Sequence, residues 1–538
     1  MRIPTSLLDR IDVPAIVREE LLSRNRFLPP DLVNYALHRN APQVSDWLAT
    51  TLRREIRPSR HDIILAKKAP RGSRPLPFMA LEDRLLYRAV VSPLRDALPN
   101  SRVSIEYESF LKAPLEVDRC EYVLKADIAG FYQYIDHERL IDEVIAQTGD
   151  DLAVGAAVEF IQGSSGRRFG LPQMSQPSDT LADCYIDPIQ RNLLRHEYPT
   201  FRYVDDFRVA CTDYEHALGA LELLERSAFS LGLILNDSKT LTPSVETYEQ
   251  SLNTVKQAEE ELFSRLEGTI EGFFLLTSGY GDQADDDREL LPWLPGLEDD
   301  EVDSAPGTAG APNDVQVAAA NHVLTMWDDD QRANVVWTSG TWAVLLRKAF
   351  AVLASDAADN GANHSMTVGL ATNLLIYEPH LTHELVNYLT ALGQAETDLV
   401  SKIVDEAAAK HVLSPWQLLW LAHLAGTLPI SSRRTPRHVA WLQHEAEFGR
   451  HDAVAARAAL ALAQRQLLTV GEAHKTYERV ESPHHRTVAL ALAAAEGRTR
   501  QQRTHDDLID GFAASWVHSQ KWGQSAARRR VVRKSKGV

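Results

Sequence analysis

The sequence has few cysteines: three in 538 residues, separated by long stretches of chain (Cys120, Cys184 and Cys211). Thiols so few and so scattered exclude a disulfide framework and a cysteine zinc site, and we expect them to be buried or incidental. Long apolar runs are also missing, and none approaches the roughly 20 residues that a membrane-spanning helix needs. The amino-terminal segment carries charges where a signal peptide is apolar. We therefore expect a cytoplasmic protein with no membrane partner.

Positive charge is scarce overall, since the formal net charge is −17. Such a balance argues against a nucleic-acid partner, because phosphate binding usually accompanies a basic surface. The distribution weakens this objection. Residues 282–303 hold ten acidic residues against Arg288 alone, a net −9, whereas residues 53–74 hold eight basic residues against two acidic ones, a net +6. A second basic cluster, at residues 528–536, is interpreted as a solvated tail.

The chain is too long for one hydrophobic core, because single cores stop growing near roughly 250–300 residues. Its composition, 44% hydrophobic and 24% charged, is that of an ordinary folded protein. Residues 1–250 mix short apolar runs with helical periodicity, which predicts an α+β domain. We expect strands at 122–132 and 201–212 and helices at 137–149, 177–198 and 212–232.

The second half of the chain has a different texture. Residues 251–315 are interpreted as a connector with an acidic mobile insertion, because 279–312 combine acidic runs with glycine and proline. Residues 316–538 are almost wholly helical in pattern, which favours an α-solenoid or an irregular helical array ending in a basic tail. Seven amphipathic segments carry this prediction: 319–329, 341–358, 365–378, 381–393, 396–410, 415–428 and 452–468.

Two adjacent carboxylates, Asp205 and Asp206, stand at a predicted turn between two apolar runs. Polymerisation of nucleotides uses two divalent cations roughly 3.5–4 Å apart, held by carboxylates. A hairpin tip at Tyr203-Val204-Asp205-Asp206 would project both acids beyond a sheet, as such a site requires. The four residues alone fit an ordinary Asp-Asp turn equally well.

The surrounding segments resemble, in order, the palm motifs of reverse transcriptases. Ala126-Asp127-Ile128-Ala129-Gly130-Phe131-Tyr132 is similar to the first motif, and Tyr203-Val204-Asp205-Asp206 follows it as the third. The resemblance implies a fingers and palm fold in which Mg²⁺ or Mn²⁺ is held by Asp127, Ile128, Asp205 and Asp206. It also implies that Tyr132 blocks a ribose 2′-hydroxyl. Tyr132 is alternatively a core aromatic.

Between these motifs, Gly170-Leu171-Pro172-Gln173 followed by Ser178 resembles the family's GLPQG-x-x-x-S element. The resemblance implies that Gln173 and Ser178 pack against the template base and the incoming nucleotide. Met174 stands where the family pattern has glycine, a departure that concerns template or nucleotide handling and leaves metal binding untouched.

Two basic elements complete the resemblance, which covers residues 50–245. Leu231–Thr240 is similar to the motif after the third, so Lys239 is the candidate proton donor to the leaving pyrophosphate, with a solvated lysine as the alternative. Upstream, Lys67, Lys68 and Arg74 are similar to the fingers segment that clamps the nucleotide triphosphate. Charge-assisted contacts with phosphate supply the physical reason.

The subclass is suggested by Phe131-Tyr132 and Ile135-x-His137, which resemble the first motif of abortive-infection and related prokaryotic reverse transcriptases. In that group a palm is joined to a HEAT-like helical domain. The resemblance implies antiphage defence and DNA synthesis from dNTPs that can be protein-primed and template-independent. An RNA template, a non-coding RNA and a homo-oligomer remain open, with Tyr35 and Tyr280 as accessible priming candidates.

Two further interpretations complete the predictions. Asp136 and His137 are read as a helix cap and polar surface, and His484-His485 carries no metal-ligand spacing. The alternative function is a defence scaffold, in which the helical domain binds a phage protein or RNA and the palm only senses nucleotides.

Overall fold

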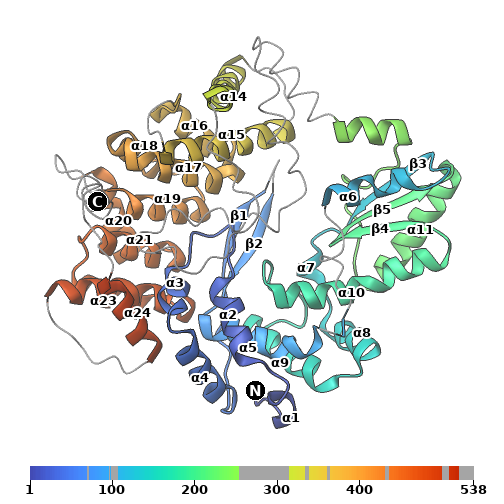
Figure 1. The fold of residues 1–538 in the computed structure, drawn as a ribbon, viewed down its shortest axis with the longest axis horizontal. Coiled ribbons are helices and arrows are strands. Elements are labelled where there is room, and N and C mark those ends of the chain that lie inside the picture. Colours follow the sequence, from blue (N-terminus) through green and yellow to red (C-terminus); the bar gives the residue numbers. More distant parts are fainter. Residues whose placement is uncertain are drawn as a thin grey trace, which may run out of the picture.

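The computed structural model describes residues 1–68, 72–95, 97–98, 107–253, 314–333, 339–359, 364–429, 436–499 and 508–519. The predicted acidic insertion, Tyr280 within it and the basic carboxy-terminal cluster lie outside these residues. Figure 1 shows a helical array on one side, a palm built on a small sheet on the other, and a two-stranded hairpin between them. None of the described helices is long and apolar enough to cross a membrane.

The amino-terminal region and the fingers form the base of the molecule. Four helices, α1 (Thr5–Leu8), α2 (Val13–Leu22), α3 (Leu32–His38) and α4 (Ala41–Leu52), precede the antiparallel hairpin of β1 (Asp62–Lys67) and β2 (Ser73–Phe78), which leads into α5 (Leu81–Val91). In β1, Ile64 and Ala66 are buried whereas Ile63 and Leu65 are each 52% exposed. Alternate residues of a strand point to opposite faces, so Ile64 and Ala66 lie on one face of the hairpin. The helix α19 (Pro415–Thr427) of the array packs against β1.

The palm contains a three-stranded antiparallel sheet in the order β3-β5-β4. Its strands are β3 (Tyr122–Asp127), β4 (Thr200–Tyr203) and β5 (Asp206–Cys211). Helix α11 (Tyr214–Ser230) packs on β3 and β5, and α10 (Gln176–Arg195) packs on β4. The remaining described elements of the palm are the helices α6 (Tyr107–Lys112), α7 (Phe131–Tyr134), α8 (His137–Thr148) and α9 (Asp151–Ser165), with a short 3-10 turn at Ala113–Glu116. The predicted mixture of helix and strand is confirmed here.

The carboxy-terminal half is helical throughout its described parts. Successive helices stack in two rows: α15, α17, α19, α21 and α23 in one row, and α16, α18, α20 and α22 in the other. This stacking agrees with the expected helical array; its HEAT-like character stays a prediction. The bounds are α14 (Asp314–Ala333), α15 (Ser339–Asp359), α16 (Val368–Tyr377), α17 (Thr382–Ala395), α18 (Thr397–Ala408), α20 (Arg437–Phe448), α21 (Asp452–Gln464), α22 (Val470–Arg479), α23 (His485–Thr499) and α24 (Leu508–Ser519).

Small residues set the close packing within the array. Helix α21 buries a run of alanines. A Cβ atom added at Gly426 of α19 would lie 3.0 Å from the Cα of Ala461 in α21, so the two helices approach closely at this point. The array is also tied to the fingers by polar contacts. His484 Nε2 lies 2.7 Å from Asp62 Oδ2, and Arg486 pairs with both Glu82 and Asp510.

Candidate active site

The sheet brings two of the three predicted carboxylates directly opposite each other. Asp127 is the last residue of β3 and pairs in register with Asp206, the first residue of β5. Asp205 immediately precedes β5, and its backbone carbonyl accepts a hydrogen bond from the N–H of Ile128 at 3.2 Å. Asp127 and the Asp205-Asp206 pair, 78 positions apart in the sequence, therefore meet at one end of the sheet.

The turn that carries Asp205 and Asp206 is held in a strained conformation. Val204 has φ 56°, in the left-handed region that β-branched residues rarely adopt. Arg202 of β4 donates from Nη1 to the carbonyl of Val204 at 3.0 Å and pairs with Asp183 of α10 at 3.1 Å. The side chains of Arg202 and Asp183 are almost wholly buried, at 1% and 5% exposure. A buried ion pair thus fixes the backbone from which both carboxylates project.

Like charges crowd at this end of the sheet. Burial, together with the neighbouring charges of Asp206 and Asp127, raises the pKa of Asp205 to about 6. Burial also raises the pKa of Asp206, against the opposing effect of Arg208, whose Nη1 lies 3.9 Å from Asp206 Oδ1. A bound cation would further relieve the mutual repulsion of these three carboxylates.

Asp127 is engaged by the segment that follows α11. Lys239 donates from Nζ to Oδ1 of Asp127 at 2.7 Å, and Asn236 donates from Nδ2 to Oδ2 at 3.1 Å. The segment is held alongside β3 by backbone hydrogen bonds, including one from Lys125 N–H to the carbonyl of Leu241 at 2.8 Å. The predicted proton donor Lys239 is therefore beside the predicted metal ligands, with its side chain 42% exposed.

The carboxylate cluster suits hard divalent cations, because Mg²⁺ prefers oxygen ligands. In the described part of the chain, however, no three acidic, histidine or cysteine side chains are placed to ligate one ion. Each oxygen of Asp127 accepts one hydrogen bond, from Lys239 and from Asn236, and keeps a further lone pair for a cation. The metal roles of Asp127, Ile128, Asp205 and Asp206 stay predictions.

The fingers hairpin places its basic residues near the same cluster. Lys67 ends β1 opposite Ser73, and the N–H of Lys68 donates to the carbonyl of Gly72 at 3.1 Å. Loss of solvent lowers the pKa of Lys68, and the positive charges of Lys239 and Arg74 lower it further. Burial lowers the pKa of Arg74, against the opposing charge of Asp205. Lys68 and Arg74 thus lie within electrostatic reach of the carboxylates.

Tyr132 and the glycine-containing loop lie together. The N–H of Leu171 donates to the carbonyl of Tyr132 at 2.7 Å, and the Tyr132 hydroxyl donates to Asp179 at 2.6 Å. The side-chain oxygen of Gln173 is buried with no hydrogen-bond partner among the described residues, so it is available to a ligand donor. Met174 has φ 59°, in the left-handed region that favours glycine.

Ser178 is fully buried, and its hydroxyl shares a 3.0 Å hydrogen bond with Tyr87; its proposed contact with the nucleotide stays a prediction. His137 was expected at the polar surface, which is wrong. It is fully buried, and its Nε2 lies 2.8 Å from the carbonyl of Gly170. The predicted cap role of Asp136 is confirmed by the hydrogen bond that it accepts from Arg139 N–H at 3.0 Å.

Sequence reasoning missed the residues that hold the site in place. Arg202 and Arg208 lie within the segment expected as a strand at 201–212, and Asp183 within the helix expected at 177–198, with no role predicted for any of them. The sequence signal that could have found them is the presence of Arg202 and Arg208 among the apolar residues of the predicted strand, because a charged residue there needs a buried partner. Arg202 and Arg208 are 3% and 2% exposed, so their charged groups interact with other buried parts of the protein and not with solvent.

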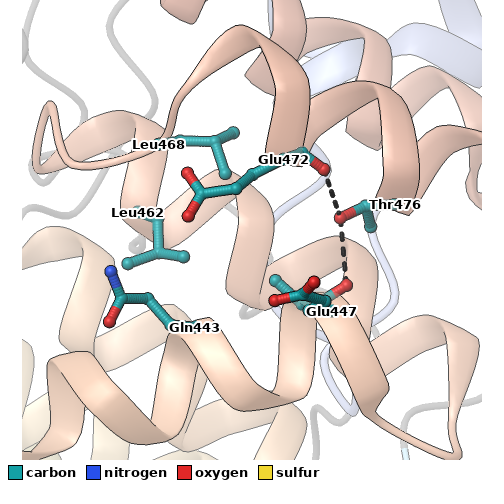
Figure 2. A pocket seen from close by; sticks show the side chains of 7 residues that line it. Gln443, Glu447, Leu462, Leu468, Glu472 and Thr476 are labelled. Carbon is teal, nitrogen blue, oxygen red and sulfur yellow. Dashed lines mark hydrogen bonds between the residues drawn. The ribbon is translucent and has the colours of Figure 1, made fainter.

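A small pocket lies elsewhere, between α20, α21 and α22 of the array (Figure 2). Thr476 donates within it to the carbonyls of Ala446 and Glu472 at 3.0 and 3.1 Å. The residues lining it include Gln443, Leu462 and Leu468 and none of the predicted site residues.

Comparison with protein families identifies the catalytic part. Residues 65–253 match the family model described as reverse transcriptase (RNA-dependent DNA polymerase). No curated protein matches the chain. The chain therefore contains a reverse transcriptase domain and is an RNA-directed DNA polymerase-like nucleotidyltransferase, whose family generally uses divalent metal ions, nucleotide substrates and nucleic acid.

Proposed function

We propose that the chain is a DNA polymerase of antiphage defence, which joins deoxynucleotides by two-metal transfer at Asp127, Asp205 and Asp206. The observation that carries the proposal is the convergence of these carboxylates at the end of β3 and at the β4–β5 turn. When bound, two divalent cations supply activation of the attacking hydroxyl and stabilisation of the leaving group.

The surrounding residues take the other roles. Lys239 approaches the carboxylates from the side and gives a proton to the leaving pyrophosphate. Three basic residues of the β1–β2 hairpin and its turn neutralise the triphosphate: Lys67, Lys68 and Arg74. Tyr132 limits space beside the sugar, with its hydroxyl anchored on Asp179.

An exposed basic surface supports a nucleic-acid partner despite the acidic net charge. The segment before β1 packs against the end of α9, since the N–H of His61 donates to the carbonyl of Ser164 at 3.3 Å. Four exposed arginines gather there, and none makes an ion pair within the described ranges: Arg57, Arg60, Arg167 and Arg168. Such a surface suits the phosphates of an RNA template or a DNA product.

The defence role, the HEAT-like array and synthesis that is protein-primed and template-independent follow from the resemblance at Phe131–His137 and the two-row array. Tyr35 is half-buried, with the Arg24 guanidinium 5.5 Å from its ring centre, and burial raises the pKa of its hydroxyl. Its half-buried hydroxyl makes it a less accessible priming candidate than a fully exposed tyrosine. A homo-oligomer built through the array remains part of the proposal.

The deciding experiment is incubation of the purified chain with labelled dNTPs and Mg²⁺, with and without RNA. The product is then digested separately with protease and with nuclease. We expect nuclease-sensitive label in the wild type and none with Asp205→Asn, which removes one carboxylate charge and keeps the side chain's shape. Label that shifts after protease treatment indicates protein priming, and label without RNA indicates template independence. Absence of product under all conditions contradicts the proposal.

A second candidate is the defence scaffold, favoured by one observation: Lys239 and Asn236 already occupy both oxygens of Asp127. A palm that only senses nucleotides has no need of free metal ligands. This function predicts that Asp205→Ala and Asp206→Ala leave phage protection intact, while changes in the array abolish it. Loss of protection in both aspartate variants eliminates the scaffold.

A further inference from the structure

The segment between α2 and α3 is gripped by the helical array through its backbone. The indole N–H groups of Trp416 and Trp420 both donate to the carbonyl of Phe27, at 2.6 and 3.1 Å. Arg457 donates to the carbonyl of Pro30 at 3.1 Å. Two helices of the array, α19 and α21, thus hold a segment that is nearly 400 residues away in the sequence.

These donors are committed to the segment. Trp416 and Trp420 are 0% and 2% exposed and Arg457 is 8% exposed, so they are removed from water. Burial lowers the pKa of Arg457 to about 10, against the opposing charge of Asp31. A buried donor without a partner is costly, which makes the position of the segment and the packing of the array interdependent.

Phe27, in the same segment, also contacts Arg74 of β2, a residue of the proposed nucleotide site. The guanidinium carbon of Arg74 lies 4.7 Å from the centre of the Phe27 ring, within the range of a cation–π contact. His383 of α17 contacts the same ring, with the ring centres 5.3 Å apart. Arg74 pairs with Ala66 in the hairpin, on the face turned toward the array. Phe27 therefore lies between the array and Arg74.

We propose that Phe27 is a positioning residue, through which the helical array holds Arg74 in the orientation that binds the nucleotide triphosphate. A free arginine side chain samples many rotamers, and ordering it costs free energy. The Phe27 ring removes part of that cost before the nucleotide arrives, and Trp416 and Trp420 fix where the ring lies. The inference rests on the proposed function only in taking Arg74 as a ligand of the triphosphate.

The consequence is control of nucleotide affinity from the array. A displacement of α19 relative to β1 moves the carbonyl of Phe27, and with it the ring beneath Arg74. Contacts elsewhere between the array and the fingers, such as Arg486 with Glu82, do not involve Phe27 and serve as the comparison.

The test measures the equilibrium dissociation constant of a fluorescent dNTP, with Ca²⁺ as the divalent ion, together with kcat and KM for incorporation. Phe27→Leu keeps an apolar side chain and removes the ring, and we expect the dissociation constant and KM to rise about 3- to 10-fold with kcat within 2-fold. Phe27→Tyr keeps the ring and restores wild-type values. Trp420→Phe removes one of the two indole donors to the Phe27 carbonyl, together with part of the ring that packs there, and shifts affinity in the same direction as Phe27→Leu. Arg486→Gln, the matched control, leaves affinity unchanged.

The outcomes separate this inference from the proposed function. Unchanged dNTP affinity in both Phe27→Leu and Trp420→Phe overturns the inference, even where Asp205→Asn abolishes synthesis and the polymerase assignment stands. An equal rise in Arg486→Gln also overturns it, because it indicates general loosening of the interface. Shifted affinity in a chain that makes no DNA supports the inference while the polymerase proposal fails. Absence of dNTP binding to the wild type overturns it outright.

Discussion

Lys239 Nζ lies 2.7 Å from Oδ1 of Asp127, so the proposed proton donor and a proposed metal ligand form an ion pair. Asn236 holds the second oxygen of the same carboxylate at 3.1 Å. We expect a cation at Asp127 and the Lys239 ammonium group to compete electrostatically for the same carboxylate.

The first prediction concerns Lys239→Ala. Removing the competing cation is expected to tighten binding of Mn²⁺ to the nucleotide-free protein several-fold, measured by isothermal titration. The same change removes the proposed proton donor and is expected to lower kcat by about 10²- to 10⁴-fold. Lys112→Ala is the control, because that exposed lysine pairs with Glu108 on α6, away from the carboxylates. Unchanged Mn²⁺ affinity in Lys239→Ala contradicts the competition.

The second prediction concerns the ion pair behind the catalytic turn. Asp183→Asn leaves Arg202 buried without its counter-charge, and breaking a buried pair typically costs about 3–5 kcal/mol of unfolding free energy. Urea unfolding measures this loss. Arg191→Gln on the same helix removes a partly exposed arginine that pairs with Glu143 and Asp187, for which about 1 kcal/mol or less is expected. Equal effects of the two changes would show that Arg202 has no special role at the turn.

The sequence predicts the parts of the site that depend on local pattern. The strand expected at 122–132 is observed only over Tyr122–Asp127, because Phe131–Tyr134 form the helix α7. The segment expected as a strand at 201–212 forms β4 and β5, joined by the predicted turn at Asp205 and Asp206. All seven helical segments expected after residue 316 overlap observed helices. Four helices were not individually predicted, α20, α22, α23 and α24, of which α20 and α22 carry many polar residues.

What the sequence could not give are relations between distant segments. His137 looks like a surface residue at the start of a helix, but the loop at Gly170 covers it and takes its hydrogen bond. The link from Trp420 to Phe27 spans 393 positions and depends only on how the array meets the fingers. Tertiary packing, which no local pattern encodes, decides both.

The third prediction concerns the backbone at Met174. A residue with a Cβ in the left-handed region costs about 1–2 kcal/mol, whereas glycine adopts that region freely but loses about 0.5–1 kcal/mol of chain entropy on folding. Met174→Gly is therefore expected to raise the unfolding free energy by about 0.5–1 kcal/mol, measured by urea unfolding. Met174→Ala keeps the Cβ and should give no gain. A loss of stability in Met174→Gly would mean that the methionine side chain packs more favourably than its 39% exposure indicates.

The fourth prediction concerns the exposed arginines beside α9. For single-stranded nucleic acid, each lost phosphate contact reduces the slope of log K against log salt by about 0.7. The double variants Arg57→Gln/Arg60→Gln and Arg167→Gln/Arg168→Gln are each expected to lower the slope by about 0.7–1.4, measured by fluorescence anisotropy with labelled RNA. The control is Arg226→Gln, an exposed arginine of α11 that pairs with Glu222. Identical slopes in all variants place the nucleic acid elsewhere.

The fifth prediction concerns Asp83, a carboxylate buried at the start of α5, 4% exposed, with Oδ2 accepting a hydrogen bond from Ser59 N–H at 3.1 Å. Burial raises its pKa from 3.8 to about 6, against the opposing Ser59 hydrogen bonds. The native state therefore binds this proton more tightly than the unfolded chain does. Its contribution to stability is greatest below pH 3.8 and is lost as pH rises through 6.

Asp83→Asn cannot titrate and isolates this contribution. The wild type is expected to lose about 1–2 kcal/mol of unfolding free energy relative to Asp83→Asn between pH 5 and pH 8, because the proton must leave a buried carboxyl over that range. Urea unfolding of both proteins at each pH gives the difference, and other titrating groups cancel in it. A difference that stays constant, or that grows in favour of the wild type with rising pH, shows that the Ser59 hydrogen bonds outweigh the burial of Asp83.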